Sequence, residues 1–144
     1  MADLGFRILG SIHRRVYRLT GGTVGGQIAR LPILLLTTTG RRSGQPRTQP
    51  LAYTQAGDGY AVIASKGGAG RHPLWYLNLR ANPLAEVTVG RETRNVRARD
   101  ADGEERERLW RALADLYGGY DRYAKKTRRR IPVVVLEPAE TTVS

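Results

Sequence analysis

The feature that most constrains the fold is a series of short segments with strand character, separated by Gly-rich or charged turns. These segments are residues 33–38, 48–54, 60–65, 84–89, 93–99 and 131–136. Residues 56–59 between two of them are typical of a hairpin turn, because Asp and Gly tolerate the positive φ that tight turns need. Consecutive parallel strands would need a helix between them, which most of these segments lack. The sequence therefore predicts an α+β, mainly β fold of about six mostly antiparallel strands with peripheral helices.

Two segments inside this region have helical character. Residues 74–80 follow Pro73, a suitable first residue for a helical turn, and end before Asn82 and Pro83. Residues 102–117 repeat apolar side chains at helical spacing. Asp102 with Glu105 three residues later forms a capping-box pattern at the start of that second helix.

The chain divides into three parts. We expect an amphipathic helix and a Gly-rich connection in residues 1–30, the folded domain in residues 31–138 and a tail in residues 139–144. The helix places apolar side chains every fourth residue opposite a basic face, so it packs on the domain, caps the pocket or lies on an anionic membrane surface. No apolar run is long enough to cross a bilayer, and no secretory signal is evident. We therefore expect a cytoplasmic protein, with peripheral contact to the inner face of the membrane as the alternative role of the helix.

Basic residues dominate the first half of the chain. The 144 residues carry 24 Lys and Arg against 13 Asp and Glu, a formal charge of +11, and only Asp3 and Asp58 are acidic in residues 1–82. Such a field attracts a nucleic acid, an acidic membrane surface, or a small ligand with phosphate and carboxylate groups. A solvated basic surface that only keeps the protein soluble explains the charge equally well.

Several reaction classes are excluded by what the sequence lacks. It contains no cysteine, which excludes a disulfide framework, a Cys-bound metal and a thiol nucleophile. It has no GxGxxG after a strand, no P-loop, no HExxH and no GxSxG. His13 and His72 lie far apart in unlike contexts, so we expect no metal site.

The first candidate binding element is the loop of residues 40–47. Its two glycines allow backbone N–H groups to converge on an anion, and Arg41, Arg42 and Arg47 can bind phosphate or carboxylate in bidentate fashion. A basic hairpin turn is the structural alternative.

Two further elements carry aromatic side chains. Residues 64–79 run from a strand end through glycines to a short helix, so a flat ligand could lie along residues 65–68 with Trp75 as a wall. Trp75 equally fits a core position. Tyr117, Tyr120 and Tyr123 are spaced by three, which brings the phenols together if the segment is helical. They could contact a planar substrate, donate a proton, or fill core positions.

These elements, in this order, resemble the deazaflavin-dependent nitroreductase family, whose members use reduced coenzyme F420, an 8-hydroxy-5-deazaflavin. The resemblance covers roughly residues 30–138 and rests on residues 34–47, 64–68, 73–83 and 131–135. It implies that residues 31–138 form a deazaflavin-binding domain, a split β-barrel like that of FMN-binding oxidases with the coenzyme in a groove on the barrel.

The resemblance also implies a role for each matching residue. The phosphate and oligoglutamate tail would lie on Arg41, Arg42, Ser43 and Arg47. The deazaflavin ring would lie against Ser65, Lys66, Gly67, Gly68, Trp75 and Asn78. The electron acceptor would be surrounded by Ser65, Trp75, Tyr117, Tyr120 and Tyr123. Our hypothesis is that Tyr120 or Ser65 stabilises or protonates the reduced acceptor.

The resulting prediction is an F420H2-dependent oxidoreductase that transfers a hydride to a small quinone, enone or nitro compound. The alternatives are an FMN-dependent oxidoreductase on the same fold and a basic nucleic-acid-binding module, although no recognition-helix, RNP or zinc-finger pattern is present. The sequence permits a monomer or a homodimer. The basic stretch of residues 125–130 departs from the family pattern, which leaves its role and the acceptor preference open.

Overall fold

The computed structural model describes residues 32–65, 71–126 and 129–139. Within them lie the strands β1 Ile33–Thr39, β2 Pro46–Ala52, β3 Thr54–Ala56, β4 Gly59–Ile63, β5 Leu84–Val89, β6 Glu92–Asp100 and β7 Val133–Pro138. The helices of the same residues are α2 Leu74–Ala81, α3 Gly103–Leu116 and α4 Gly119–Lys126. The mainly β fold class is therefore confirmed, with seven strands in the described residues where the sequence predicted about six.

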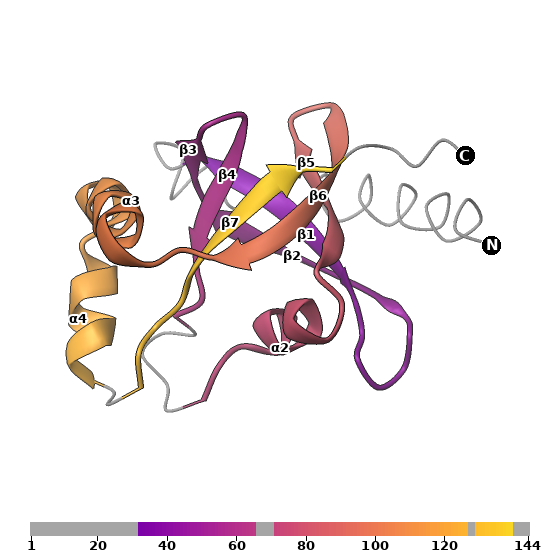
Figure 1. Ribbon diagram of the computed structural model, residues 1–144, viewed down its shortest axis with the longest axis horizontal. Coiled ribbons are helices and arrows are strands. Elements are labelled where there is room, and N and C mark those ends of the chain that lie inside the picture. Colours follow the sequence, from indigo (N-terminus) through magenta and orange to yellow (C-terminus); the bar gives the residue numbers. More distant parts are fainter. Residues whose placement is uncertain (1–31, 66–70, 127–128, 140–144) are drawn as a thin grey trace.

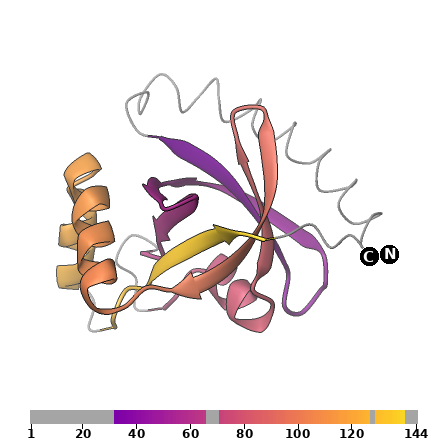
Figure 2. The same ribbon diagram turned by 45° about the horizontal axis from the view of Figure 1, so that its top comes forward.

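The strands form one sheet in the order β2-β1-β5-β6-β7-β4-β3, and every pair of neighbours is antiparallel. The two outermost strands, β2 and β3, are consecutive in the chain and separated only by Tyr53. A single residue can join opposite edges of a sheet only if the sheet curls until those edges meet. The result is a barrel that is split between β2 and β3, and Figures 1 and 2 show the curled sheet.

This closure corrects the prediction of one strand over residues 48–54. The N–H of Tyr53 donates to the carbonyl of Pro32 (3.1 Å), which ends the pairing of β2 with β1. Beyond that point β3 pairs with β4 instead. Hydrophobic alternation alone does not reveal the change of partner, because both pieces are extended.

Two hydrophobic clusters cover the two faces of β4 and β7. Alternate residues of β4 and β7, including Val62 and Val134, pack inside the barrel with Trp75. The residues between them, including Ile63, pack on the outer face with Leu113. Because successive side chains of a strand point to opposite faces, strands covered on both sides appear as continuous apolar runs.

The helices cover different parts of the sheet (Figures 1 and 2). Helix α2 packs on β1, whereas α3 packs on β3, β4 and β7 and contacts α4. Asp102 is the N-cap residue of α3, as predicted, but its side chain makes no capping hydrogen bond. The predicted capping box is wrong because Glu105 instead accepts two hydrogen bonds from the guanidinium of Arg99 (2.6 and 2.8 Å).

The predicted N-terminal helix and the tail after residue 139 lie outside the described residues. Among the residues that the structure describes, no helix is both long enough and apolar enough to cross a bilayer.

Candidate functional site

Two adjoining cavities lie between β2 and α2. The first has a volume of about 530 Å³ and the second about 490 Å³. Both are lined by Gln49, Leu74 and Trp75, so the two cavities meet at these side chains. Beyond this junction the first cavity extends to Ser65, Ile63, Pro73, Tyr117 and Tyr120, and the second to Arg41, Arg42, Ser43, Arg47 and Asn78.

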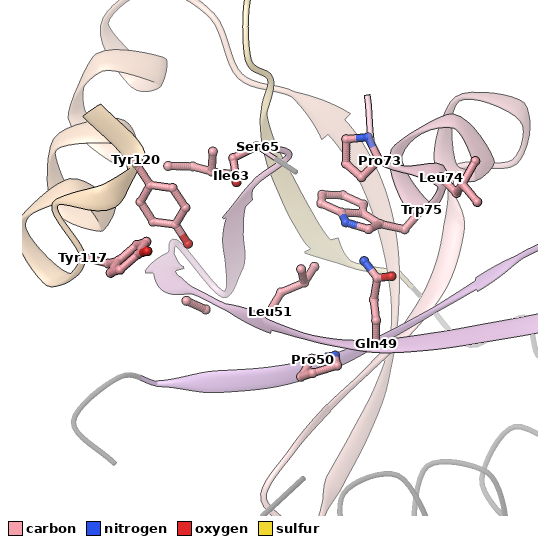
Figure 3. A pocket seen from close by; sticks show the side chains of 11 residues that line it. Gln49, Pro50, Leu51, Ile63, Ser65, Pro73, Leu74, Trp75, Tyr117 and Tyr120 are labelled. Atoms are coloured by element: carbon pink, nitrogen blue, oxygen red, sulfur yellow. The ribbon is translucent and has the colours of Figure 1, made fainter. Parts of the chain in front are cut away.

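One face of β2 changes from basic to apolar along the two cavities. Arg47, Gln49 and Leu51 alternate along the strand, so their side chains share a face. Arg47 lines the second cavity, Gln49 lines both, and Leu51 lines the first. Figure 3 shows Gln49 and Leu51 pointing from β2 toward the space below Trp75. The site is therefore cationic at one end and aromatic and apolar at the other.

The loop of residues 40–47 is held by its own hydrogen bonds. The N–H of Gly40 donates to Gln45 O (2.8 Å), that of Gly44 to Gly40 O (2.8 Å), and that of Gln45 to Ser43 Oγ (3.1 Å). Gly44 has a φ of 71°, which favours glycine. A Cβ on Gly40 would lie 2.7 Å from Ser43 Oγ, so alanine there would displace the hydroxyl group that accepts the hydrogen bond from the Gln45 N–H. These N–H groups are not available to an anion, which would instead meet the exposed guanidinium groups of the loop.

Asn78 ties this loop to α2. Its Oδ1 accepts a hydrogen bond from the N–H of Arg41 (3.1 Å), and its Nδ2 donates to Thr38 Oγ1 (3.0 Å). The side chain is buried and also lines the second cavity. The sequence predicted that Asn78 contacts a deazaflavin ring, which stays a prediction. The hydrogen bonds give Asn78 a different, observed role, which is to position the backbone of the arginine loop.

The glycine-containing element is described only at its ends. Ser65 lines the first cavity, whereas Lys66, Gly67 and Gly68 lie outside the described residues. Trp75 combines the two roles that the sequence left open. It is only 4% exposed and belongs to the barrel core, yet it lines both cavities.

Two of the three tyrosines come together, although the helix is broken between them. Tyr117 ends α3 and Tyr120 lies in α4, and their rings meet edge to face with centroids 5.2 Å apart. Both line the first cavity, and Figure 3 shows the Tyr120 hydroxyl directed into it. The side chain of Tyr123 lies outside the described part of the structure.

A hydrogen bond between two helices holds Tyr120 in place. The Trp110 indole N–H donates to Asp121 Oδ1 (2.9 Å), and the Trp110 ring lies 6.4 Å from the ring of Tyr120. The guanidinium of Arg106 lies over Trp110 and donates to the carbonyl of Ile131 (2.7 Å). Helix α4 is therefore fixed against α3 next to the cavity.

Sequence reasoning missed the residues of β2 that line the cavities. Gln49 and Leu51 belong to no motif, and only the alternation Arg47–Gln49–Leu51 could have indicated a shared face. Leu74 begins α2 as predicted, and it also lies 67% exposed at the junction of the cavities, which helical spacing does not reveal.

Comparison with known proteins decides the family. A family profile described as F420H(2)-dependent quinone reductase matches residues 10–138. The chain belongs to this family. The match confirms the predicted oxidoreductase class and coenzyme F420, and among the predicted acceptors it favours the quinone type.

Relatives of this quinone reductase family support the same assignment. A Mycobacterium tuberculosis protein named F420H(2)-dependent quinone reductase is 43% identical over 129 residues, which cover 87% of each chain. A solved structure described as F420-H2 dependent reductase (FDR-A) is 44% identical, with a TM-score of 0.68, over 74% of this chain and 94% of that one. Another, described as a domain-swapped dimer, is 44% identical with the same TM-score, over 74% of this chain and 80% of that one. The split barrel is thus confirmed, and the dimeric relative is consistent with the homodimer alternative.

Proposed function

We propose that this chain binds coenzyme F420 across the two adjoining cavities and reduces a quinone at the tyrosine end. The observation that carries the proposal is the polarity of the site, which is cationic at Arg41, Arg42 and Arg47 and aromatic at Trp75 and Tyr120. Coenzyme F420 has the matching asymmetry, since a planar ring carries an anionic tail of phosphate and glutamates. The side chains that are present therefore fit the coenzyme.

The cationic end would hold the tail. Exposed guanidinium groups bind phosphate and carboxylate as two parallel hydrogen bonds, and solvent screening keeps each such contact to about 1 kcal/mol. Ser43 adds a hydroxyl group beside them. Gln49 lies where the two cavities meet, so its amide would face the part of the coenzyme between the tail and the ring.

The aromatic end would position the acceptor. When bound, the reduced deazaflavin supplies a hydride. The chain's own task is to hold the acceptor at near-attack distance, exclude water and stabilise the negative charge that develops on the acceptor oxygen. Tyr120 suits the last task because its hydroxyl faces the cavity while its ring is buried against the sheet. Ser65, which lines the same cavity, offers a second hydroxyl group.

A quinone fits this end because it is flat and because hydride addition leaves a negative charge on its oxygen, which then takes up a proton. Enones and nitro compounds share these two properties, so we include them as acceptors of the same site. Tyr117 and Trp75 supply aromatic walls for any of the three. A contact of Tyr123 with the acceptor stays a prediction from the resemblance.

The tail assignment is tested with Arg47→Ala and Arg41→Ala. We expect each to weaken coenzyme binding about tenfold at low salt, which corresponds to about 1.4 kcal/mol, and to flatten the salt dependence of binding. Arg91→Ala is the matched control, because Arg91 is an exposed arginine in the β5–β6 turn that lines neither cavity. Unchanged affinity in both loop variants would contradict the assignment.

The proton-donor role is tested with Tyr120→Phe. This change keeps the ring and its packing but removes the hydroxyl, so turnover with a water-soluble naphthoquinone should fall 10²-fold or more if general acid catalysis is lost, on the order that such catalysis contributes. Coenzyme affinity should stay within about twofold of wild type, since the ring itself still fills its place. A large loss of affinity with unchanged turnover would show that Tyr120 binds the coenzyme instead.

The alternatives from sequence are separated by one titration. Purified protein is titrated with F420, FMN and a DNA duplex at two salt concentrations. We expect tightest binding for F420, because only its tail presents several anions to the arginine loop in addition to a ring. Tighter binding of FMN or of the duplex would refute the proposed coenzyme.

A further inference from the structure

Arg129 is not among the residues that line the first cavity, but it connects two segments that do. It lies in the basic stretch of residues 125–130. Its Nη2 donates to the carbonyl of Ser65 (2.7 Å), and its Nη1 donates to the carbonyl of Ala64 (3.2 Å). The same Nη1 lies 3.1 Å from Nδ1 of His72. One guanidinium group thus contacts the end of β4 and the segment that leads into α2.

The carbonyls of Ala64 and Ser65 lie just beyond the last residue pair between β4 and β7. The N–H of Ala64 still donates to Pro132 O (2.9 Å), but the ladder between β4 and β7 ends at Ile63. Ala64 is fully buried, and a buried carbonyl without a donor is costly. Arg129 donates to this carbonyl and to the next one, and thereby continues the ladder at the residue that enters the cavity, Ser65.

The contact between Arg129 and His72 holds the segment that leads into α2, which forms another wall of the cavity. His72 precedes Pro73, which lines the cavity facing Ser65 (Figure 3). A guanidinium only donates, so Nδ1 of His72 accepts and the ring proton is on Nε2. Burial and the charge of Arg129 lower the pKa of His72, which favours this neutral form. The ring also packs on Tyr76, with centroids 4.8 Å apart.

We propose that Arg129 is a positioning residue for the reaction: it holds the backbone of Ser65 against His72 and so sets the place of the Ser65 hydroxyl in the cavity. This inference rests on the proposed function, in which Ser65 contacts the coenzyme and the acceptor. It gives a role to one member of the basic stretch that sequence patterns left unassigned.

The chemistry requires arginine at this position. A planar guanidinium donates to two neighbouring carbonyls and a third acceptor at once, whereas the ammonium of lysine is a point charge that cannot match this fork. Arg129→Lys keeps the charge and most of the stem, so it separates the geometry from the charge. Arg130→Ala is the matched control, because Arg130 is the adjacent arginine and is exposed.

The test is a double-mutant cycle with Ser65→Ala, measured as turnover of F420H2 with a water-soluble naphthoquinone. We expect Arg129→Lys to lower kcat about fivefold to tenfold in the wild-type background and less than about twofold in the Ser65→Ala background, since coupled residues are not additive. Arg129→Ala should lower kcat further, with partial recovery in millimolar guanidinium. Arg130→Ala should stay close to wild type in both backgrounds.

Two results would overturn the inference. One is wild-type turnover in Arg129→Lys and Arg129→Ala. The other is an equal loss in both Ser65 backgrounds, because a residue that only stabilises the fold acts independently of that hydroxyl. Should Arg129→Ala not fold, the cycle with Arg129→Lys decides alone.

A measurement without coenzyme keeps the two proposals distinguishable. Amide hydrogen exchange of residues 63–65 should be faster in Arg129→Lys than in Arg130→Ala, because the guanidinium no longer holds both carbonyls. If the wild-type protein neither binds F420 nor reduces quinones, the proposed function fails while this exchange still tests the contact. Equal exchange in the two variants refutes the positioning role.

Discussion

Replacement of Asn78 by leucine tests whether this residue positions the arginine loop or contacts the ring of the coenzyme. Leucine has a similar volume but makes neither the hydrogen bond from the Arg41 N–H nor the one to Thr38. Each neutral hydrogen bond contributes about 1 kcal/mol, and the hydroxyl of Thr38, a residue that is only 2% exposed, loses its partner in a buried place. We therefore expect a loss of about 2–3 kcal/mol in the free energy of unfolding.

Thermal unfolding measures this loss directly. For a protein of this size a loss of 1 kcal/mol lowers Tm by about 3–4 °C, so Asn78→Leu should unfold about 8 °C below wild type. Asn82→Ala is the control, because the Asn82 side chain also accepts a hydrogen bond from a backbone N–H, that of Leu84 (3.1 Å), but at an exposed site outside both cavities. It should lower Tm by less than about 4 °C.

Two ligands separate the two roles of Asn78. Intact F420 carries the tail, whereas a deazaflavin fragment without phosphate and glutamates carries only the ring. If Asn78 positions Arg41, Asn78→Leu should weaken binding of F420 about tenfold and leave binding of the fragment nearly unchanged. Equal weakening of both ligands would refute the positioning role and favour the ring contact predicted from sequence. A Tm no lower than that of Asn82→Ala would show that the two hydrogen bonds contribute little to stability.

Two further predictions concern stability at high pH and the acceptor end of the site. Burial and the hydrogen bond to Asp100 raise the pKa of Tyr76 to about 12. Its contribution to the free energy of unfolding is therefore complete below about pH 10 and is lost as the pH rises toward 12. Tyr76→Phe should remove this pH dependence, and identical unfolding profiles of the two proteins above about pH 10 would contradict it. A Cβ on Gly119 would collide with the ring of Tyr117, so Gly119→Ala should raise the acceptor KM severalfold without changing coenzyme affinity. Gly118→Ala, where a Cβ meets nothing within 4 Å, is its control in steady-state kinetics, and equal KM values for the two would refute the assignment.

Local patterns were sufficient for most elements of the fold. The segment 84–89 is a strand with the predicted bounds, and α2 starts at Leu74 as predicted from Pro73. These elements are encoded by alternation, proline and helical spacing, which act over a few residues. The capping box failed because Glu105 pairs with Arg99, six residues earlier near the end of β6, and the capping pattern does not take that position into account.

The sequence also identified most residues of the site, but not how they are arranged in space. The arginines of residues 41–47, Ser65, Trp75 and the first two tyrosines all line the cavities. Gln49 and Leu51 were missed because their role depends on which face of β2 is turned toward α2. That orientation follows from the pairing of β2 with β1, which the sequence does not display.

By itself the sequence determined the strand-rich fold and the basic loop, because each is encoded by residues close together in the chain. Through the ordered set of segments that carry the resemblance, it also determined the coenzyme class. Only the tertiary structure decided that β2 and β3 close the barrel, that Asn78 holds the backbone of Arg41 and that Arg129 reaches Ser65. These contacts join residues that are far apart in sequence or lie on opposite edges of the sheet. They form because buried carbonyls, N–H groups and amides must find partners once the sheet has curled, and the nearest partners are set by the fold.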